Sequence, residues 1–223
     1  MKRIATTELL DTDSGTAAEV AASLSDLRRI NLWFGGLATT ENLVEHVARI
    51  TNRSSLSLLE VAAGSGYVPE TARARLRPRG YCLQVTSLDR VQGHMSNGGR
   101  AVAGDALGLP FRDGSFDLVS CNLFAHHLSP PDLVQFIDEA LRACRVAVLI
   151  NDLIRHPLHL ALVYAGLPLY RSRLTRHDAP ASVRQAYTPE EMQEVLAQTR
   201  AARFEIHRHY LFRMGVTAWK NGH

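Results

Sequence analysis

Acidic residues stand at two points of this chain where an apolar segment ends, and their spacing suits the binding of a nucleoside. The run Leu58-Leu-Glu-Val-Ala-Ala-Gly-Ser-Gly66 contains an acid, Glu60, and passes into a glycine-rich turn. A second apolar run over residues 81–88 ends at Asp89. Glycine lets the backbone approach a ligand closely, and an acid at the tip of the second strand can accept hydrogen bonds from both ribose hydroxyls. The pattern predicts a strand, turn, helix and strand arranged around a nucleoside.

The turn departs from the dinucleotide-binding pattern G-x-G-x-x-G/A in two ways. Pro69 stands where the third small residue of that pattern belongs, and Glu60 would repel a pyrophosphate. S-adenosylmethionine (SAM) carries an ammonium and a sulfonium but no phosphate. Both departures therefore favour SAM over NAD as the ligand.

Two further segments complete a set of four ordered motifs. Gly104-Asp-Ala106 precedes Leu109-Pro-Phe111, and a predicted strand over residues 116–121 is followed by Asn122. With these motifs the chain resembles the class I SAM-dependent methyltransferases, especially the small-molecule branch that includes ubiquinone- and menaquinone-type enzymes. The resemblance is strong over residues 55–155.

The resemblance implies a role for each motif. The E/D-x-G-x-G-x-G loop would hold the methionine portion of SAM, the acid after the second strand the ribose, and the Gly-Asp-Ala step the adenine amino group. Asn122 would lie near the reaction centre. The implied cofactor-binding residues are Glu60, Ala62, Gly64, Gly66, Asp89, Asp105, Ala106 and Asn122. Ala62 departs from the family pattern, which has glycine at this position.

Histidine is the natural candidate for taking a proton from a methyl acceptor. A phenolic hydroxyl, whose pKa is about 10, becomes a better nucleophile once deprotonated. His126 and His127 follow the predicted fourth strand, and His177 is followed by Asp178. We expect His177, His126 or His127 to be the general base, with Asp178 and Asn151 as helpers of His177. An alternative role for the pair 126–127 is to anchor the backbone of its loop.

No metal site is predicted from the spacing of possible ligands. His207 and His209 would share a strand face but have no third ligand nearby in sequence. A site formed by Cys121, His126 and His127 would require strained local geometry.

Composition agrees with a soluble enzyme. The chain has 223 residues, a hydrophobic share of 46% and a net charge of +3, which is too small to indicate a nucleic-acid partner. An apolar segment over 158–170 is shorter than the roughly 20 residues of a membrane span, and no secretion signal follows Met1-Lys2-Arg3. The cysteines, which lie in or just before predicted buried strands, are Cys82, Cys121 and Cys144. Their odd number and spacing favour reduced thiols and a cytoplasmic location. A homodimer is left open.

Alternating strands and helices predict an α/β fold with a Rossmann-like, mostly parallel sheet and helices on both faces. The resemblance implies seven strands. Capping signals at Thr16, Ser129 and Thr188 predict three helix starts. We expect one methyltransferase domain over 1–223, with an N-terminal helical arm or lid over 1–50 and a SAM-binding core over 55–155. A helical, substrate-side insertion after the fifth strand would cover 156–188, and a C-terminal helix and strand pair 189–223.

The arm and the insertion are the candidate substrate-binding segments. Gly35 and Gly36 follow an aromatic stretch and would be the hinge of a lid, unless the arm simply packs on the domain surface. Residues 158–170 would be either an oily wall of the substrate site or a surface buried against the core or a partner subunit.

Residues 151–188 look like bacterial methyltransferases associated with type III polyketide synthases, which act on alkylresorcinols, alkylpyrones and related quinols. The resemblance implies methyl transfer to a hydroxyl of a small aromatic, quinol or polyketide-type (alkylresorcinol or pyrone) substrate, with S-adenosyl-L-homocysteine (SAH) as the second product. The alternatives are C-methylation of a quinol or phenol ring and a non-catalytic SAM-binding regulatory subunit.

Overall fold

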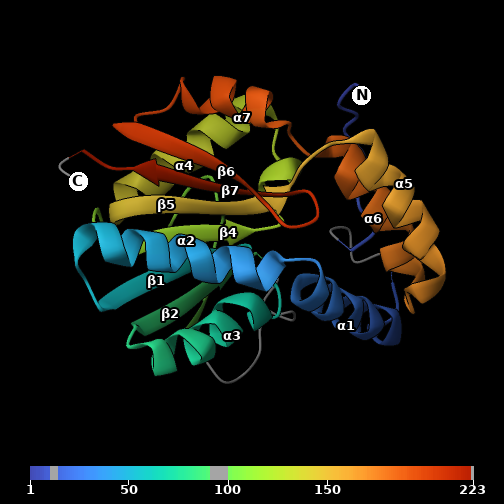
Figure 1. Cartoon of the computed structure of the whole chain (residues 1–223), viewed down its shortest axis with the longest axis horizontal. Coiled ribbons are helices and arrows are strands. Elements are labelled where there is room, and N and C mark those ends of the chain that lie inside the picture. The colour runs from blue at the N-terminus through green and yellow to red at the C-terminus, as the bar shows by residue number, and fades with distance from the viewer. Residues whose placement is uncertain (11–14, 91–99, 222–223) are drawn as a thin grey trace.

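A seven-stranded sheet forms the centre of the computed structural model, which describes residues 1–10, 15–90 and 100–221 (Figure 1). Its strands are β1 (Ser55–Val61), β2 (Cys82–Asp89), β3 (Arg100–Ala103), β4 (Phe116–Asn122), β5 (Cys144–Leu153), β6 (Arg203–His209) and β7 (Arg213–Trp219). Their order across the sheet is β3-β2-β1-β4-β5-β7-β6. The first five in this order pair in parallel, whereas β7 runs antiparallel to both β5 and β6. The predicted mostly parallel sheet and its final antiparallel pair are confirmed.

Helices cover both faces of the sheet and also form a group beyond one end of the strands (Figure 1). The α-helices of the described residues are α1 (Ala17–Trp33), α2 (Gly36–Thr51), α3 (Tyr67–Leu76), α4 (Pro130–Ala143), α5 (Pro157–Gly166), α6 (Arg173–Gln185) and α7 (Pro189–Leu196). Helices α2 and α3 pack on one face, and α4 and α7 on the other. Helix α6 contacts both α1 and α5 at the end of the sheet. Nowhere in the described ranges is a helix both long and apolar enough to cross a membrane.

Side-chain caps explain where three of these helices begin. The predicted capping box is present at Thr16, which accepts from the N–H of Glu19 while the Glu19 carboxylate accepts from the Thr16 backbone. Thr188 and Glu191 form a second box at the start of α7. Ser129 accepts from the N–H of the third residue of α4, whose first residue is a proline. Helix α2 begins directly after Gly35, whose left-handed backbone makes the turn from α1.

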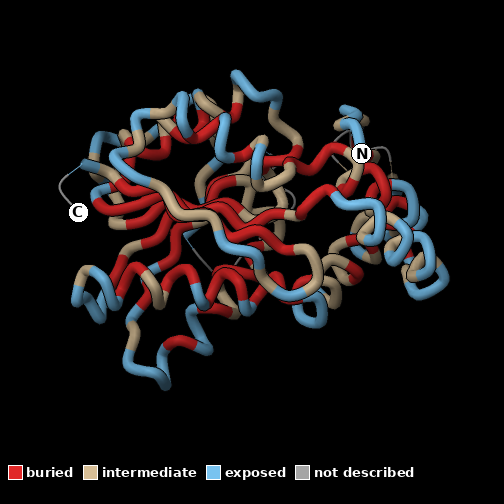
Figure 2. The backbone as a smooth tube through the Cα atoms, turned by 45° about the horizontal axis from the view of Figure 1, so that its top comes forward, coloured by how far each residue is buried: buried red, intermediate tan, exposed pale blue. Residues whose placement is uncertain are grey.

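The core consists of two apolar layers, one on each face of the sheet. Adjacent residues of β1 alternate between them: Leu58 packs with α2 and α3, and Leu59 with α4 and α7. Figure 2 shows the resulting concentration of buried backbone along the central strands. Burial on both faces makes these strands a rigid platform whose carboxyl ends carry the functional side chains.

The cysteine prediction needs one correction. All three are free thiols, and Cys121 and Cys144 are buried as expected, but Cys82 is exposed. Cys82 is the first residue of β2, so it stands at the edge of the core and not within it.

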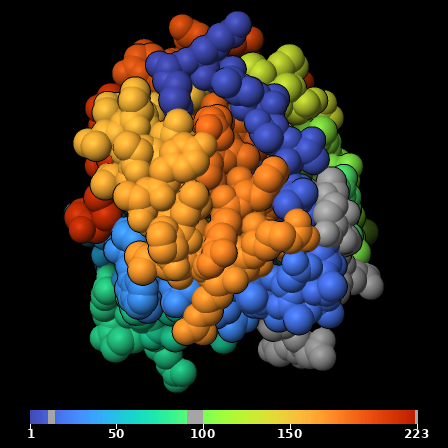
Figure 3. Space-filling model, turned by 90° about the vertical axis from the view of Figure 1, so that its right-hand side faces the viewer, coloured from blue at the N-terminus to red at the C-terminus, as the bar shows by residue number. Residues whose placement is uncertain are grey.

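Residues 1–10 lie across α6, as Figure 3 shows from the side of α1, α5 and α6. Asp178 of α6 accepts hydrogen bonds from the backbone N–H groups of Leu9, at 2.8 Å, and Leu10, at 3.1 Å. The Arg3 guanidinium donates to the carbonyls of Gln185, at 2.7 Å, and His126, at 3.0 Å. These contacts hold the N-terminal segment against the carboxyl end of the sheet.

Candidate active site

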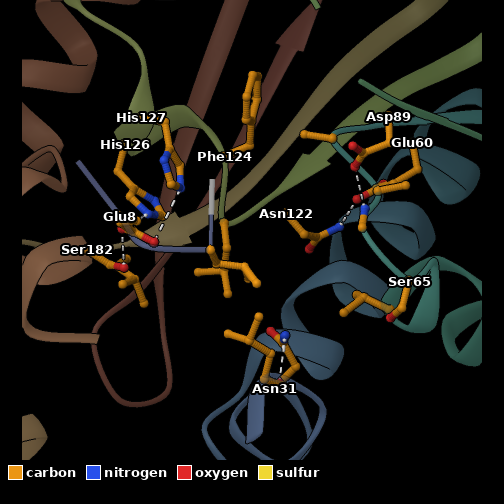
Figure 4. Close-up of a pocket in the computed structure, with 18 of the residues that line it drawn as sticks. Glu8, Asn31, Glu60, Ser65, Asp89, Asn122, Phe124, His126, His127 and Ser182 are labelled. Carbon is orange, nitrogen blue, oxygen red and sulfur yellow. Dashed lines mark hydrogen bonds and ion pairs between the residues drawn. The ribbon is translucent and has the colours of Figure 1, made fainter. Parts of the chain in front are cut away.

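A cavity of about 590 Å³ lies where the strand ends meet α1, α6 and the N-terminal segment. Its volume is in the range of small-molecule sites. Acidic residues from the ends of β1 and β2 line one end, and a group of acidic and histidine side chains lines the other (Figure 4). Of the predicted cofactor-binding residues, those that line it are Glu60, Ala62, Gly64, Asp89, Asp105, Ala106 and Asn122.

The turn after β1 has the open backbone that the sequence indicates. Ala62, Gly64 and Gly66 have φ angles of 53°, 52° and 68°, in the left-handed region. The N–H of Gly64 donates to Oδ2 of Asp89 at 2.7 Å, which joins the ends of β1 and β2. Gly66 precedes the first residue of α3 and shapes the turn without lining the cavity.

Glu60 is buried at the base of this end of the cavity. Its carboxyl accepts hydrogen bonds from the Ser120 hydroxyl and the Asn122 amide, both on the neighbouring strand β4. Burial disfavours the charged form and raises the pKa of Glu60 to about 7, although the two hydrogen bonds oppose the rise. Asn122 is oriented in turn by Thr40 and Asn151, which both donate to its Oδ1 at 2.7 Å.

The residues present fit SAM. Three carboxylates, Glu60, Asp89 and Asp105, line the same cavity, an arrangement that suits hydroxyl, amine and cationic groups better than a phosphate. Asp105 is kept in its loop by accepting from the N–H of Leu107 at 2.9 Å. The open turn beside Gly64, where an added Cβ would meet nothing within 4 Å, leaves room for close approach of a ligand.

His126 lies at the other end of the cavity, in a short 3₁₀ turn (Ala125–His127) after β4. Its Nδ1–H donates to Oδ1 of Asp152 at 2.6 Å, and its backbone N–H donates to Oδ2 of the same carboxylate at 2.9 Å. Its Nε2 lies 3.5 Å from Oε1 of Glu8. The buried imidazole thus stands between two carboxylates.

The charges of Asp152 and Glu8 decide whether the His126 imidazole is protonated. Burial alone would lower the pKa of His126, but the charge and hydrogen bond of Asp152, together with Glu8, raise it to about 10. Burial alone would raise the pKa of Glu8 and of Asp152, but His126 holds both below their usual values. His126 is therefore an imidazolium at neutral pH, which is the wrong form for the general base that the sequence suggested.

Glu8 connects the N-terminal segment to both histidines. Its Oε1 accepts from the Ser182 hydroxyl at 2.6 Å and the Gln185 amide at 2.7 Å, both on α6. Its Oε2 lies 3.9 Å from Nε2 of His127, whose side chain is 20% exposed. His126 and His127 both line the cavity, and His127 is the more exposed of the two and therefore the better placed to contact an acceptor.

The structure does not bring His177 to the cavity. Its side chain is 47% exposed and donates through Nδ1 to Asp178 at 2.9 Å. The α6 residues that line the cavity are Ala179, Ser182 and Val183, whose spacing defines one helix face. His177 is two positions before Ala179 and therefore points to the opposite side of α6. Asp178 does pair with His177, as expected, but it also holds the N-terminal segment. The Asn151 amide instead donates to the carbonyl of Gly36 and to Thr40.

Several residues of the site were not identified from the sequence. Glu8 lies in a stretch whose sequence shows neither helix nor strand periodicity, so no sequence pattern marks it as a site residue. Asp152 carries a signal, because it ends a predicted strand at the same edge of the sheet as Asp89. Arg213 and Asn31 also line the cavity, and the buried Arg213 guanidinium donates to the side-chain Oδ1 of Asn31 at 3.1 Å.

The remaining wall is largely apolar. Helix α1 contributes Leu24, Leu27 and Ile30, so the arm does cover the cavity. The insertion contributes His159 and Val163 from α5 and also Tyr170. Other apolar residues of the insertion, such as Leu158 and Leu162, are exposed and lie outside the lining of the cavity.

Comparison with known proteins identifies the class. Residues 59–148 match the family model described as a methyltransferase domain, Methyltransf_11. The matched range holds the glycine turn, Asp89, Asp105 and Asn122. No curated protein sequence matches the chain.

Solved structures extend the likeness over the whole fold. The plantazolicin methyltransferase BpumL in complex with SAH has a TM-score of 0.73 at 12% identity, over 96% of this chain and 94% of its own. BamL, crystallised with a triazolic desmethylPZN analogue and SAH, has a TM-score of 0.69 at 12% identity, over 91% of each chain. A SAM-dependent methyltransferase from Aquifex aeolicus has a TM-score of 0.52 at 16% identity, over 74% of this chain and 81% of its own. The chain thus contains a methyltransferase domain over residues 59–148, its fold is that of the class I SAM-dependent methyltransferases, and SAM is the cofactor that such a domain binds.

Proposed function

We propose that this methyltransferase acts on a hydroxyl of a small aromatic, quinol or polyketide-type acceptor, such as an alkylresorcinol or pyrone. The observation that supports this most is the pairing of His127 with the Glu8 carboxylate in the cavity that contains the cofactor residues. The apolar side chains of α1 and α5 would hold the hydrocarbon part of such an acceptor.

SAM, when bound, supplies an electrophilic methyl group on a sulfonium. Transfer of this methyl group to the acceptor oxygen would leave SAH, with the electron pair of the broken carbon–sulfur bond on sulfur. His127 accepts the acceptor's hydroxyl proton, and Glu8 stabilises the imidazolium that results. The buried His126–Asp152 pair positions Glu8 from behind. The acceptor is thus activated within the apolar wall, where water competes poorly.

A panel of acceptors tests the proposal. Purified protein is incubated with SAM and a catechol, a resorcinol, a quinol or a pyrone, and SAH is measured by chromatography. Mass spectrometry and NMR of the product distinguish O-methylation from C-methylation. Because BamL was crystallised with a desmethylPZN analogue, an azole-containing peptide is included as a further acceptor. SAM binding without turnover of any acceptor would instead favour a regulatory subunit.

Variants test the assigned base. His127→Ala should lower kcat by about 10²–10⁴-fold, the usual contribution of a general base, with the SAM Kd unchanged. His177→Ala is the matched control, and we expect wild-type turnover because this side chain lies outside the cavity. Equal loss in both variants, or loss in His177→Ala alone, would contradict the assignment.

A further inference from the structure

Three possible metal ligands meet at the histidine end of the cavity. One ligand atom from each of Glu8, His126 and His127 lies within 4.8 Å of the others. Nε2 of His126 lies 3.5 Å from Oε1 of Glu8, and Nε2 of His127 lies 3.9 Å from Oε2 of the same carboxylate. Two ligand atoms that are each about 2.1 Å from a tetrahedral zinc ion are about 3.4 Å apart. The three side chains therefore need only small adjustments to share one cation.

The buried ring of His126 gives independent support for a ligand at this point. It is 2% exposed, and its Nε2 has no hydrogen-bond partner among the residues that the structure describes. Figure 4 shows this ring directed toward Glu8, with His127 beside it. The contact of this nitrogen with Oε1 of Glu8, at 3.5 Å, is too long for a good hydrogen bond, and a buried imidazole nitrogen without one is costly unless a ligand satisfies it.

The contacts around the ligands are those that orient a metal-binding histidine. Asp152 accepts from Nδ1 of His126, which directs Nε2 toward Glu8 and the cavity. Metal-binding histidines commonly make this bond to a carboxylate through the ring nitrogen that does not bind the metal. Glu8 is positioned likewise by Ser182 and Gln185.

We propose that Glu8, His126 and His127 form a binding site for a divalent first-row transition metal ion, with its open positions facing the methyl acceptor. Two imidazoles and one carboxylate suit zinc, iron, cobalt or nickel, and they leave room for an oxygen ligand from the acceptor. The cation would replace the Nε2 proton of His126 between the carboxylates of Glu8 and Asp152. The expectation from sequence that no metal site exists did not include Glu8.

Cation binding does not depend on the identity of the acceptor, but its role rests on the proposed function. A divalent cation lowers the pKa of a bound hydroxyl, as zinc does for water. In the metal-bound protein His127 would be a ligand and the acceptor's proton would pass to solvent. Polarisation of the hydroxyl by the cation would then take the place of the proton abstraction that His127 performs in the metal-free protein.

Direct metal binding tests the proposal without an acceptor. The whole protein is treated with EDTA, dialysed and titrated with Zn²⁺ by competition with a chromophoric chelator, and with Co²⁺ by visible absorption. We expect one ion per chain at this site, with affinity reduced by about 10–100-fold or more in Glu8→Gln and in His127→Ala. Asp152→Asn, which alters the orientation of His126, should weaken binding by about 10–100-fold. SAM titration and circular dichroism show whether each variant is folded.

A second group of residues provides the control. His46, Glu205 and His207 also cluster, at a site remote from the cofactor turn in sequence and outside the cavity. His207→Ala should leave binding at the Glu8 site unchanged, and repeating each titration in this background removes any ion held by the second cluster. No binding in that background, or binding that is equal in Glu8→Gln, His127→Ala and their parent, would overturn the proposal. Metal binding without methylation of any phenol would refute the proposed function and leave the metal site standing.

Discussion

Oε1 of Glu8 and Nε2 of His126 lie 3.5 Å apart, although one belongs to the N-terminal segment and the other to the turn after β4. The contact places a negative charge from the first ten residues beside a buried imidazole at the end of the sheet. Asp152 holds the other side of that imidazole. The N-terminal segment is therefore part of the candidate active site and not simply an arm that covers it.

Loss of the Asp89 carboxylate should weaken cofactor binding. Its Oδ2 already accepts from the N–H of Gly64 at 2.7 Å, so the side chain shapes the glycine turn as well as facing the cavity. We expect Asp89→Ala to cost about 1.5–3 kcal/mol of SAM binding free energy, the usual contribution of charge-assisted hydrogen bonds. Calorimetric titration of SAM, SAH and NAD measures this. Asp113→Ala, which removes a largely exposed carboxylate on the surface, is the control and should bind SAM like the wild type.

Protonation of Glu60 should make SAM affinity depend on pH. Burial raises the pKa of this carboxyl to about 7, so the free protein loses the charge as pH falls through that value. Because an ionised Glu60 would attract the SAM ammonium, we expect affinity to rise about tenfold from about pH 6 to about pH 8. Glu60→Gln should flatten this dependence, and an equally steep profile in that variant would assign it to another group.

The raised pKa of Glu60 also predicts how the free energy of unfolding changes with pH. The pKa of Glu60 in the folded protein exceeds the value of about 4.3 for an unfolded glutamate, so the folded state binds more protons between the two values. The contribution of Glu60 to the free energy of unfolding is fully present below the lower value and is lost as pH rises through about 7. Urea denaturation of the wild type and Glu60→Gln across this window measures the difference; an identical pH dependence in both proteins would contradict it.

Release of the N-terminal segment should lower turnover without affecting SAM. Asp178→Ala removes the acceptor of two backbone N–H groups, those of Leu9 and Leu10, next to Glu8. We expect faster hydrogen exchange of a peptide covering residues 1–10, reduced turnover and an unchanged SAM Kd. Arg176→Ala on the same helix is the control, since its side chain is exposed and contacts the carbonyl of Tyr170 instead. Normal exchange in Asp178→Ala would show that other contacts suffice to hold the segment.

Ala62 should be a site where glycine stabilises the protein. Its φ angle of 53° is unfavourable for a residue with a Cβ, by about 1–2 kcal/mol. After the greater chain entropy of unfolded glycine is subtracted, we expect Ala62→Gly to raise the free energy of unfolding by about 1 kcal/mol. Ala63→Gly is the matched control, because Ala63 lacks a positive φ and should lose stability. Denaturant titration of both variants checks the opposite signs.

The cofactor half of the site could be predicted from sequence because its signals are local. Glu60, the glycine turn and Asp89 belong to one strand–turn–helix–strand unit, in which the secondary structure itself brings the residues together. The same reasoning predicted the starts of α1, α4 and α7, since each cap depends on neighbouring residues.

The residues at the histidine end of the cavity, opposite the glycine turn, are brought together by tertiary structure. Which histidine reaches the cavity depends on how α6 is rotated against the sheet, and that rotation places Ser182 inside and His177 outside. The position of Glu8 depends on docking of a segment without regular structure, through Asp178, onto a distant helix. The sequence by itself determined a nucleoside-binding α/β core, because adjacent residues encode it. Only packing between remote segments determined the buried group of Glu8, His126 and Asp152, because no local pattern brings these residues together.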